Sequence, residues 1–356
     1  MKKLLLLATI LVAFSANAKL TIEQKWQTKN LPAVTNDCRQ GVGHNGKFYI
    51  QDKVNQVVYV FDENGMTGDQ YSSGGNCGIA LDQEGNIVVS CATFPNAWGE
   101  TAGIKVINPN TGETRLYTVP SGAVAGRCDF IGHAKGNLFY DGELYLVGAD
   151  MTTGVYRLVI ADGEVSEDDS YLALMDNCSP TSNTLVNAFV NAAGDDALLY
   201  VTRNAPPRVC TFEGDNLDSE ALTLPNKGAC NGAQVFVLDG KNYVVYPTLP
   251  NYQDGFAVAE IGAEAAEFEI MPTGIQANGI QCNWLNVEVV DENTAMLYQY
   301  QPGGHMTVYE IKVAAPATGV NDLSVKAEKV YKTIENGQVV IVKGAAKYNV
   351  AGQAIK

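Results

Sequence analysis

The sequence predicts an all-β protein: a six-bladed β-propeller followed by a short C-terminal β-hairpin tail. Three observations lead to this prediction. Six cysteine-marked segments recur along the chain at similar spacings. Each contains short stretches that alternate apolar and polar residues and are rich in Val, Ile, Tyr and Phe. No window shows the sustained 3.6-residue apolar period of a helix, and four-strand units repeated around an axis are propeller blades.

The N-terminus has the pattern of a secretory signal peptide over residues 1–18. Lys2 and Lys3 form a basic start, residues 4–14 are apolar, and residues 15–18 end in the small-x-small pattern of a signal peptidase site. The apolar run is shorter than the roughly 20 residues that a membrane-spanning helix needs. We therefore expect cleavage after Ala18, no membrane span, and export to the periplasm, the cell surface or the medium.

The body of the chain is defined by the repeat. The six marker cysteines lie 39, 51, 50, 52 and 52 residues apart, at positions 38, 77, 128, 178, 230 and 282. The last unit, residues 282–313, holds only three strand patterns, whereas residues 20–29 form a surplus strand. Because an open sheet edge is a liability, we expect the surplus strand to complete the sixth blade as its outer strand. Residues 19–316 then form one domain.

This body resembles the broad superfamily of six-bladed propellers that includes the TolB-like, NHL and gluconolactonase-like groups. The resemblance rests on the number and length of the blades and covers about residues 19–316. It implies the fold but no single function, because the same ring hosts scaffolds, binding proteins, lyases and hydrolases.

Residues 317–356 are expected to be a separate tail after the linker at residues 314–319. Residues 326–356 carry six Lys against two Glu, and residues 330–334 and 338–343 flank an Asn-Gly turn as in a hairpin. Residues 347–353 look like part of the C-terminal sorting domains of type IX secretion, which implies contact with secretion or surface-attachment machinery. The alternative is a plain hairpin, docked on the propeller or mobile.

The cysteines are expected to be structural. Eight of them, an even number in an exported chain, favour disulfides. A hairpin that turns at Glu84 places Cys77 opposite Cys91, and a bond closing this loop would stabilise the fold by about 3 kcal/mol. Cys178 and Cys210 are the candidates for a disulfide within the fourth blade. No cysteine spacing typical of a zinc site occurs.

Composition and motifs argue against several functions. The 356 residues have a formal net charge of −15, and nucleic-acid binding needs clustered Lys and Arg instead. Gly41 to Gly46 matches G-x-G-x-x-G, but a strand rather than a helix is expected after it, so a dinucleotide site is excluded. His44 and His133 fall at equivalent first-turn positions of blades one and three, which repeat symmetry explains without catalysis.

A metal-dependent alternative depends on oxygen ligands beside the cysteines. A lactonase-like site would hold calcium or another divalent metal with carboxylate and amide oxygens at the channel mouth. The residues that could supply them, or could instead form turns that lead into the strands, are Asp37, Asp129, Asn76, Asn177, Asn231 and Asn283.

The functional surface is predicted at the face of the ring where the repeated cysteines lie, since loops there can vary while the blades hold them rigid. Aromatic rings surrounded by polar side chains suit a glycan or peptide. The candidate ligand-binding residues are Arg39, Phe94, Trp98, Arg127, Arg203, Arg208, Tyr252, Trp284, Tyr298 and Tyr300. The sequence therefore predicts an exported, non-catalytic propeller that binds a small molecule, glycan or peptide without a cofactor. The alternatives are a metal-dependent hydrolase or lyase and a structural cell-surface module.

Overall fold

Every regular element in the described part of the chain is a β-strand, as the sequence predicts. The structure is a computed structural model and describes residues 12–14, 19–29, 38–74, 77–90, 103–203, 205–225, 232–248, 254–271, 284–314, 330–335, 338–343, 346–348 and 354–355. Across these residues no helix could span a membrane. The chain divides into two units, residues 1–313 and 314–356.

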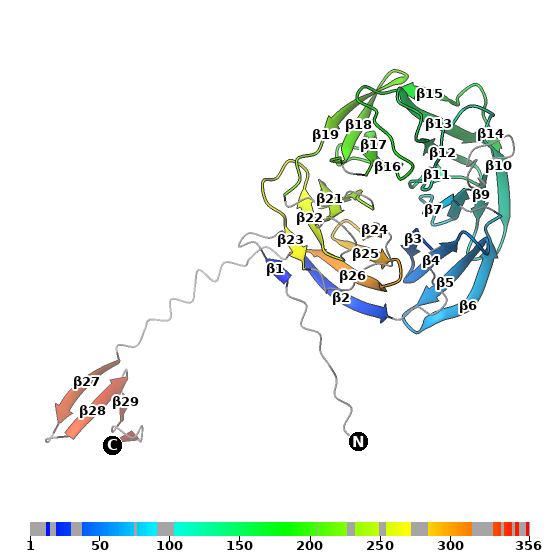
Figure 1. Cartoon of the computed structure of the whole chain (residues 1–356). Helices are drawn as coiled ribbons and strands as arrows, with labels where there is room; N and C mark the ends of the chain where they lie inside the picture. The colour runs from blue at the N-terminus through cyan, green and yellow to red at the C-terminus, as the bar shows by residue number, and fades with distance from the viewer. Residues whose placement is uncertain are drawn as a thin grey trace. The chain divides into compact units, whose positions relative to one another are not determined.

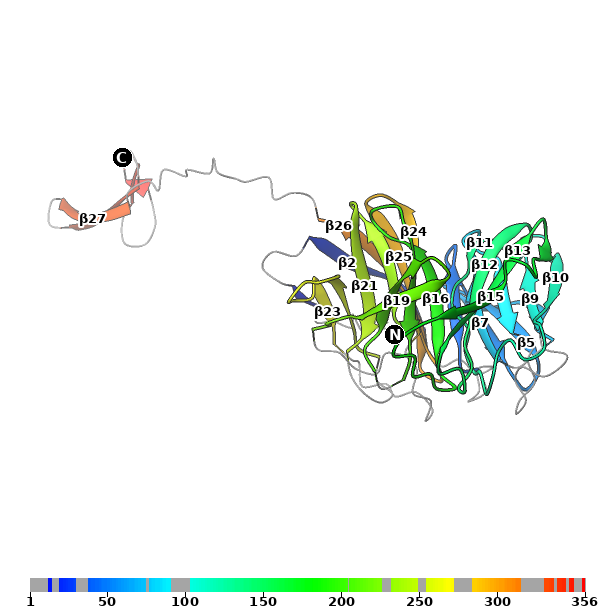
Figure 2. The same cartoon turned by 90° about the horizontal axis from the view of Figure 1, so that it is seen from above.

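The first unit is a six-bladed β-propeller, which confirms the predicted fold. Six antiparallel sheets of four or five strands surround a central axis (Figure 1). In Figure 2 their strands run between the two faces of the ring. Within a blade, consecutive strands step from the axis outward, so each blade has one inner strand beside the central channel.

The first three blades follow the chain from inner to outer strand. Blade one consists of β3 (Gly41–His44), β4 (Lys47–Asp52), β5 (Val57–Asp62) and β6 (Gly65–Ser72). Blade two consists of β7 (Cys77–Leu81), β8 (Ile87–Ser90), β9 (Gly103–Ile107) and β10 (Thr114–Thr118). Blade three consists of β11 (Lys135–Asn137), β12 (Asp141–Leu146), β13 (Gly154–Ala161), β14 (Glu164–Val165) and β15 (Tyr171–Leu174), the last two both pairing with β13.

The last three blades complete the ring. Blade four consists of β16 (Leu185–Val190), β17 (Asp196–Val201), β18 (Arg208–Glu213) and β19 (Asn216–Ala221). Blade five consists of β20 (Gln234–Leu238), β21 (Lys241–Pro247), β22 (Phe256–Glu260) and β23 (Phe268–Ile270), with β1 (Val12–Phe14) paired to its outer edge. Blade six contains β24 (Trp284–Asp291), β25 (Thr294–Gln301), β26 (His305–Val313) and, outermost, β2 (Leu20–Lys29).

The ring closes as the sequence predicts. Strand β2 pairs antiparallel with β26, from Leu20 opposite Val313 to Lys29 opposite His305, with one bulge between Gln24 and Trp26. An N-terminal strand and three C-terminal strands therefore share one blade. The backbone groups of β26 that would otherwise be left at an open edge are paired.

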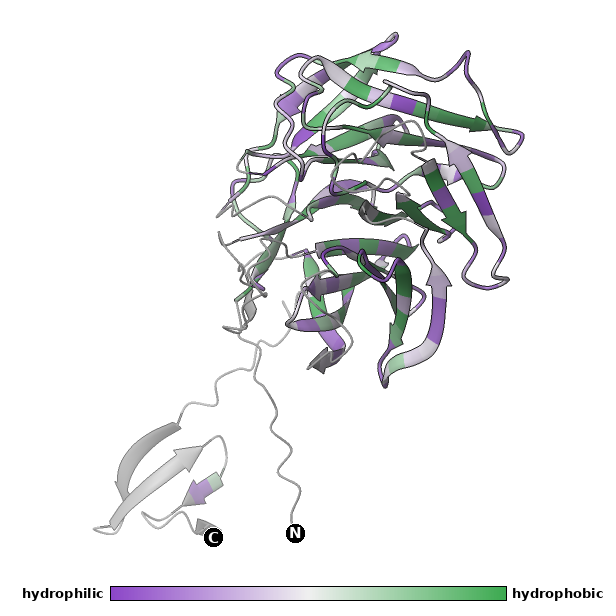
Figure 3. Ribbon diagram, turned by 45° about the vertical axis from the view of Figure 1, so that its right-hand side comes forward, coloured by the Kyte–Doolittle hydropathy of each residue, from purple (hydrophilic) through white to green (hydrophobic). Residues whose placement is uncertain are grey.

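Aromatic contacts join this closing blade to blade one. Along the strands hydrophobic and hydrophilic residues alternate (Figure 3), and the hydrophobic set fills the layers between blades. Phe48 on β4 lies between Trp26 on β2 and Tyr298 on β25, with ring centroids 5.6 and 5.4 Å apart in edge-to-face geometry. Each such pair contributes about 0.5–1.5 kcal/mol beyond its buried area.

Side-chain amides connect the inner strands around the axis. The channel-facing edge of an inner strand has no strand partner, so its backbone groups need other partners. Asn187 on β16 accepts a hydrogen bond from the His133 N–H at 2.8 Å and donates one to the Ala233 carbonyl at 3.0 Å. Three further side chains make equivalent pairs of bonds with neighbouring inner strands, and with Asn187 they form the amide girdle: Gln40, Gln234 and Asn286.

The second unit is a four-stranded antiparallel sheet. It contains β27 (Val330–Glu335), β28 (Gln338–Lys343), β29 (Ala346–Tyr348) and β30 (Ala354–Ile355). Strands β27 and β28 pair from Val330 opposite Lys343 to Glu335 opposite Gln338, which confirms the predicted hairpin. Strands β29 and β30 extend the sheet beyond the two strands that the sequence predicts.

The first hairpin of blade two has the predicted register only in part. Ile79 lies opposite Val89, as expected for a turn at Glu84. A bulge at Gly78, whose φ is +59°, then places Cys77 opposite Ser90 rather than Cys91. The predicted register is therefore wrong at its last pair. Cys91 and the Cys77 side chain lie outside the described residues, so their disulfide stays a prediction.

Cys178 and Cys210 are free thiols, which contradicts the disulfide predicted between them. Cys178 lies in the loop before β16, and its Sγ donates to the Met151 carbonyl at 3.2 Å. Cys210 lies on β18 with its Sγ 3.6 Å from the Met175 sulfur. Both side chains fill the same apolar core, where burial raises the pKa of Cys210 to about 12 and keeps the thiol protonated.

Candidate functional site

A cavity of about 470 Å³ opens at one mouth of the central channel. All six blades contribute to it, through residues at or near the ends of their inner strands. Toward the amide girdle the channel narrows to a void of about 20 Å³, little more than the space one water needs. We call this cavity the funnel. The repeated cysteines precede the inner strands, so the funnel lies at the opposite mouth from the predicted binding face.

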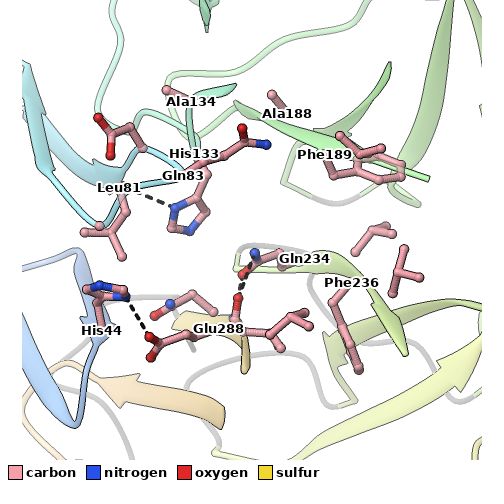
Figure 4. A pocket seen from close by; sticks show the side chains of 18 of the residues that line it. His44, Leu81, Gln83, His133, Ala134, Ala188, Phe189, Gln234, Phe236 and Glu288 are labelled. Carbon is pink, nitrogen blue, oxygen red and sulfur yellow. Dashed lines mark hydrogen bonds and ion pairs between the residues drawn. The ribbon is translucent and has the colours of Figure 1, made fainter. Parts of the chain in front are cut away.

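One side of the funnel carries a fixed carboxylate. Glu288 on β24 lies beside His44 at the end of β3, with Oε1 3.0 Å from Nδ1 (Figure 4). Its other oxygen accepts hydrogen bonds from the Tyr298 hydroxyl at 2.8 Å and the Asn45 N–H at 2.9 Å. Burial raises the pKa of Glu288, but the hydrogen bonds from His44 and Tyr298 outweigh it and hold the pKa below its ordinary value. The carboxylate is therefore ionised and well supplied with donors.

His133 presents a single hydrogen-bond donor to the funnel. Its Nδ1 accepts a hydrogen bond from the Leu81 N–H at 3.2 Å (Figure 4), so the proton of the neutral ring resides on Nε2. Burial lowers the pKa of His133 to about 4, which keeps the ring neutral at pH 7. Within the described part of the chain, no acceptor lies within hydrogen-bond distance of Nε2, so this N–H is available to a ligand.

The other side of the funnel is apolar. Ala188 and Phe189 at the end of β16 lie on this side together with Phe236 on β20 (Figure 4). Val190 and Val289 form part of the rim and expose 40% and 47% of their surfaces. A ligand in the funnel would thus meet hydrocarbon on one side and a few fixed polar groups on the other.

The lining favours a neutral ligand over an anion. Among the described residues that line it, Asp82 and Glu288 are the only carboxylates, and there is no Lys or Arg. Asp82 is buried and accepts hydrogen bonds from the backbone N–H groups of Glu84, Asn86 and Leu138. An anionic group would enter without a cation to pair with and would be repelled by Glu288.

Glycines let the inner strands approach these side chains. A Cβ atom at Gly85, whose φ is +78°, would lie 2.1 Å from His44 Nε2, and one at Gly43 would lie 2.1 Å from Tyr298 Cδ1. The G-x-G-x-x-G match at Gly41 to Gly46 is followed by strand β4. This confirms that the motif does not have the strand-to-helix context of a dinucleotide site. Gly41 and Gly43 accommodate the rings of Tyr300 and Tyr298 instead, and Gly46 has the turn-type φ of +73°.

Three of the predicted ligand-binding residues are buried between blades, which contradicts their expected exposure at the binding face. Trp284, Tyr298 and Tyr300 expose only 5%, 1% and 0% of their surfaces. Trp284 Nε1 donates to the Arg39 carbonyl, and the Tyr300 hydroxyl donates to the Cys38 carbonyl at 2.6 Å. These aromatics pack blade six against blade one. Only Tyr298 touches the funnel, through its bond to Glu288.

The predicted arginines do not line the funnel. Arg127 binds Asp129 at 2.8 Å, and Arg208 on β18 donates to the Ser219 carbonyl at 2.7 Å. Arg39 and Arg203 are half-buried near the other mouth. The predicted residues Phe94, Trp98 and Tyr252 lie outside the described residues.

The described residues contain no group of three or more His, Cys, Asp or Glu side chains that could hold a metal ion. Of the six proposed oxygen ligands, Asp129 binds Arg127 and Asn177 has the turn-type φ of +59°. The other four lie outside the described residues: Asp37, Asn76, Asn231 and Asn283.

The fold, rather than the sequence, relates this chain to known proteins. No family model matches it and no curated protein does. A solved structure of a DUF4623 family protein from Bacteroides eggerthii DSM 20697 is similar, with a TM-score of 0.57 and 10% identity over 83% of this chain and 77% of that chain. The allergen Mala s 1 of Malassezia sympodialis matches with a TM-score of 0.48 and 9% identity over 80% of this chain and 96% of that one. The first similarity supports the propeller fold and, at this identity, nothing more.

Sequence reasoning noticed His44 and His133 but gave them no role, and it missed Glu288, Phe189 and Phe236. The predicted equivalence of the two histidines is wrong, because His44 is the last residue of β3, whereas His133 lies before the start of β11. The pairing of His44 with Glu288 across the closed ring had no local signal.

Proposed function

We propose that this protein is an exported, non-catalytic β-propeller that binds an extracellular ligand, a glycan or a peptide, in the funnel. The observation that carries the proposal is the cavity of about 470 Å³ with one apolar side and a few fixed polar groups. Volume and composition are those of small-ligand sites, which are mostly apolar, with polar groups that orient the ligand.

The lining favours binding over catalysis. The residues described around the funnel include no Ser, Thr, Cys or Lys that could act as a nucleophile. A general-base histidine is usually held by a carboxylate through its second nitrogen. In His133 that nitrogen accepts a backbone N–H instead. In His44 a carboxylate, Glu288, does hold Nδ1, but Nε2 is already bonded to the Asn45 side-chain amide at 2.9 Å.

Export and the tail belong to the proposal as well. The signal pattern in residues 1–18 supports export, to the periplasm, the cell surface or the medium. Residues 314–356 form a unit of their own, which suits a segment recognised by secretion or surface-attachment machinery. Membership in the TolB-like, NHL or gluconolactonase-like superfamily is likewise part of the proposal and rests on blade number and length.

Two matched variants test the binding site. Val289→Arg places a long cation at the funnel rim, whereas Val54→Arg places it at another exposed valine, in the turn between β4 and β5. The probes are a printed glycan array and a phage-displayed random heptapeptide library. Ligands captured by the native chain should be lost with Val289→Arg and kept with Val54→Arg. Equal capture by both variants would show that the funnel is not the binding site.

A further inference from the structure

We infer that the ligand is a peptide segment that places an uncharged apolar side chain in the funnel while one of its carbonyl oxygens accepts a hydrogen bond from His133 Nε2. The inference rests on the proposed function and names the ligand class and the residue that orients it.

His133 is held in place through its backbone and through one nitrogen of its ring. Its N–H donates to Asn187 at 2.8 Å and its carbonyl accepts the Ala188 N–H at 2.9 Å. Its Nδ1 accepts the Leu81 N–H, so Nε2–H is a donor whose tautomer and position are set before a ligand arrives. A pre-positioned donor costs little ordering on binding, and its complement is an acceptor oxygen such as a peptide carbonyl.

The surface around the funnel favours a chain that extends beyond it. Val190 on blade four and Val289 on blade six lie at the rim and expose 40% and 47% of their surfaces. A ligand confined to the funnel would leave these valines in water. A peptide whose side chain enters the funnel and whose backbone crosses the rim would cover them, with a gain of roughly 25 cal/mol per Å² of apolar surface.

The aromatic side chains of the funnel favour a peptide over a glycan. Sugar rings need aromatic faces that are open to the ligand, with a polar edge nearby. Of the two phenylalanines in the described lining, Phe236 exposes only 4% of its surface and stacks on Tyr243 at 5.7 Å. Phe189 is half-buried and its ring carries no polar group, and no Trp or Tyr is among the described lining residues. With Glu288 ionised at the mouth, an acidic side chain is excluded and an apolar one fits.

The test uses heptapeptides that the full-length native chain enriches from the random phage library, synthesised and titrated by calorimetry. His133→Met removes the donor while keeping an apolar side chain. His133→Gln keeps both interactions, because its amide oxygen can accept the Leu81 N–H and its amide nitrogen can donate into the funnel. We expect His133→Met to raise Kd about tenfold, the value of one well-placed hydrogen bond, and His133→Gln to stay within about threefold of the native chain.

The outcomes separate the inference from the proposed function. One outcome is that Val289→Arg abolishes binding while His133→Met, His133→Gln and the native chain have equal Kd. This would leave the funnel as the binding site and overturn the role of His133. Funnel-dependent binding of a neutral glycan without any enriched peptide would overturn the peptide assignment alone. Enriched peptides with acidic residues at their conserved position would also overturn it. If the enriched peptides bind Val289→Arg as tightly as the native chain, both the inference and the proposed binding site are overturned. Circular dichroism of each variant confirms that the sheet is retained.

Discussion

Acidification should destabilise the propeller through His133. The folded pKa of this histidine is lowered by burial from 6.5 to about 4. Above pH 6.5 the ring is neutral in both the folded and the unfolded chain, so its contribution to stability is complete. As the pH falls below 6.5 the unfolded chain takes up a proton that the folded ring resists, and stability is lost until the folded ring also titrates near pH 4. At about 1.36 kcal/mol per pKa unit, the loss reaches about 3 kcal/mol.

The assay compares urea unfolding of the native chain and His133→Gln at about pH 7 and about pH 4.5. Carboxylates titrate in both proteins and cancel in the difference, whereas glutamine does not titrate. We expect the native chain to lose about 2–3 kcal/mol more than the variant over this range. Parallel losses in the two proteins would refute the reasoning, as would a His133 ring that titrates near pH 6.5 by NMR in the folded state.

Three further predictions concern the ring. Asn187→Leu leaves the buried His133 N–H and Ala233 carbonyl without hydrogen-bond partners, at a cost of about 1–3 kcal/mol each. Urea unfolding should therefore show a free energy of unfolding lower by about 2–6 kcal/mol, whereas the control Asn64→Leu at an exposed turn should lower it by less than about 0.5 kcal/mol. Gly43→Ala drives a Cβ to 2.1 Å from Tyr298 and should cost about 1–3 kcal/mol; an unchanged midpoint would contradict the contact. Deletion of residues 19–29 removes the whole partner strand of β26 and should abolish a monomeric peak in size-exclusion chromatography, whereas a monodisperse product would show that the ring closes without β2.

The architecture was predictable because its signals are local and repeated. Each blade shows period-two alternation and turn residues in its own sequence, and the number of recurring cysteines equals the number of blades. The closing strand could be predicted by counting strands. The last blade lacks one strand and the N-terminal end of the domain has one too many, so pairing the two completes the ring. Even the hairpin register was right from Ile79 to Leu81, and it failed only where Gly78 inserts a bulge.

The binding face was less predictable because exposure depends on packing between blades. The sequence predicts loop positions for Tyr298 and Tyr300, but both lie within β25. Residues two apart in a strand share a face, and on β25 that face packs against blade one. Their tyrosine character, which suggested a ligand contact, instead supplies large buried rings whose hydroxyls reach backbone groups and Glu288. Had the alternation of apolar and polar positions been extended through residues 298–301, it would have predicted that Tyr298 and Tyr300 are buried.

The funnel itself could not be derived from any single segment, because it exists only in the closed ring. His44 comes from blade one and Glu288 from blade six, and the amide girdle sets how far apart the ends of the six inner strands stand. A ligand that binds there binds only the closed ring, so it must stabilise closure, by about 2.7 kcal/mol at a concentration of 100 times Kd. The same linkage sets what a girdle substitution does: because Asn187 makes its bonds to the backbone of neighbouring blades, Asn187→Leu should weaken apparent ligand binding only by the factor by which it lowers the fraction of closed rings.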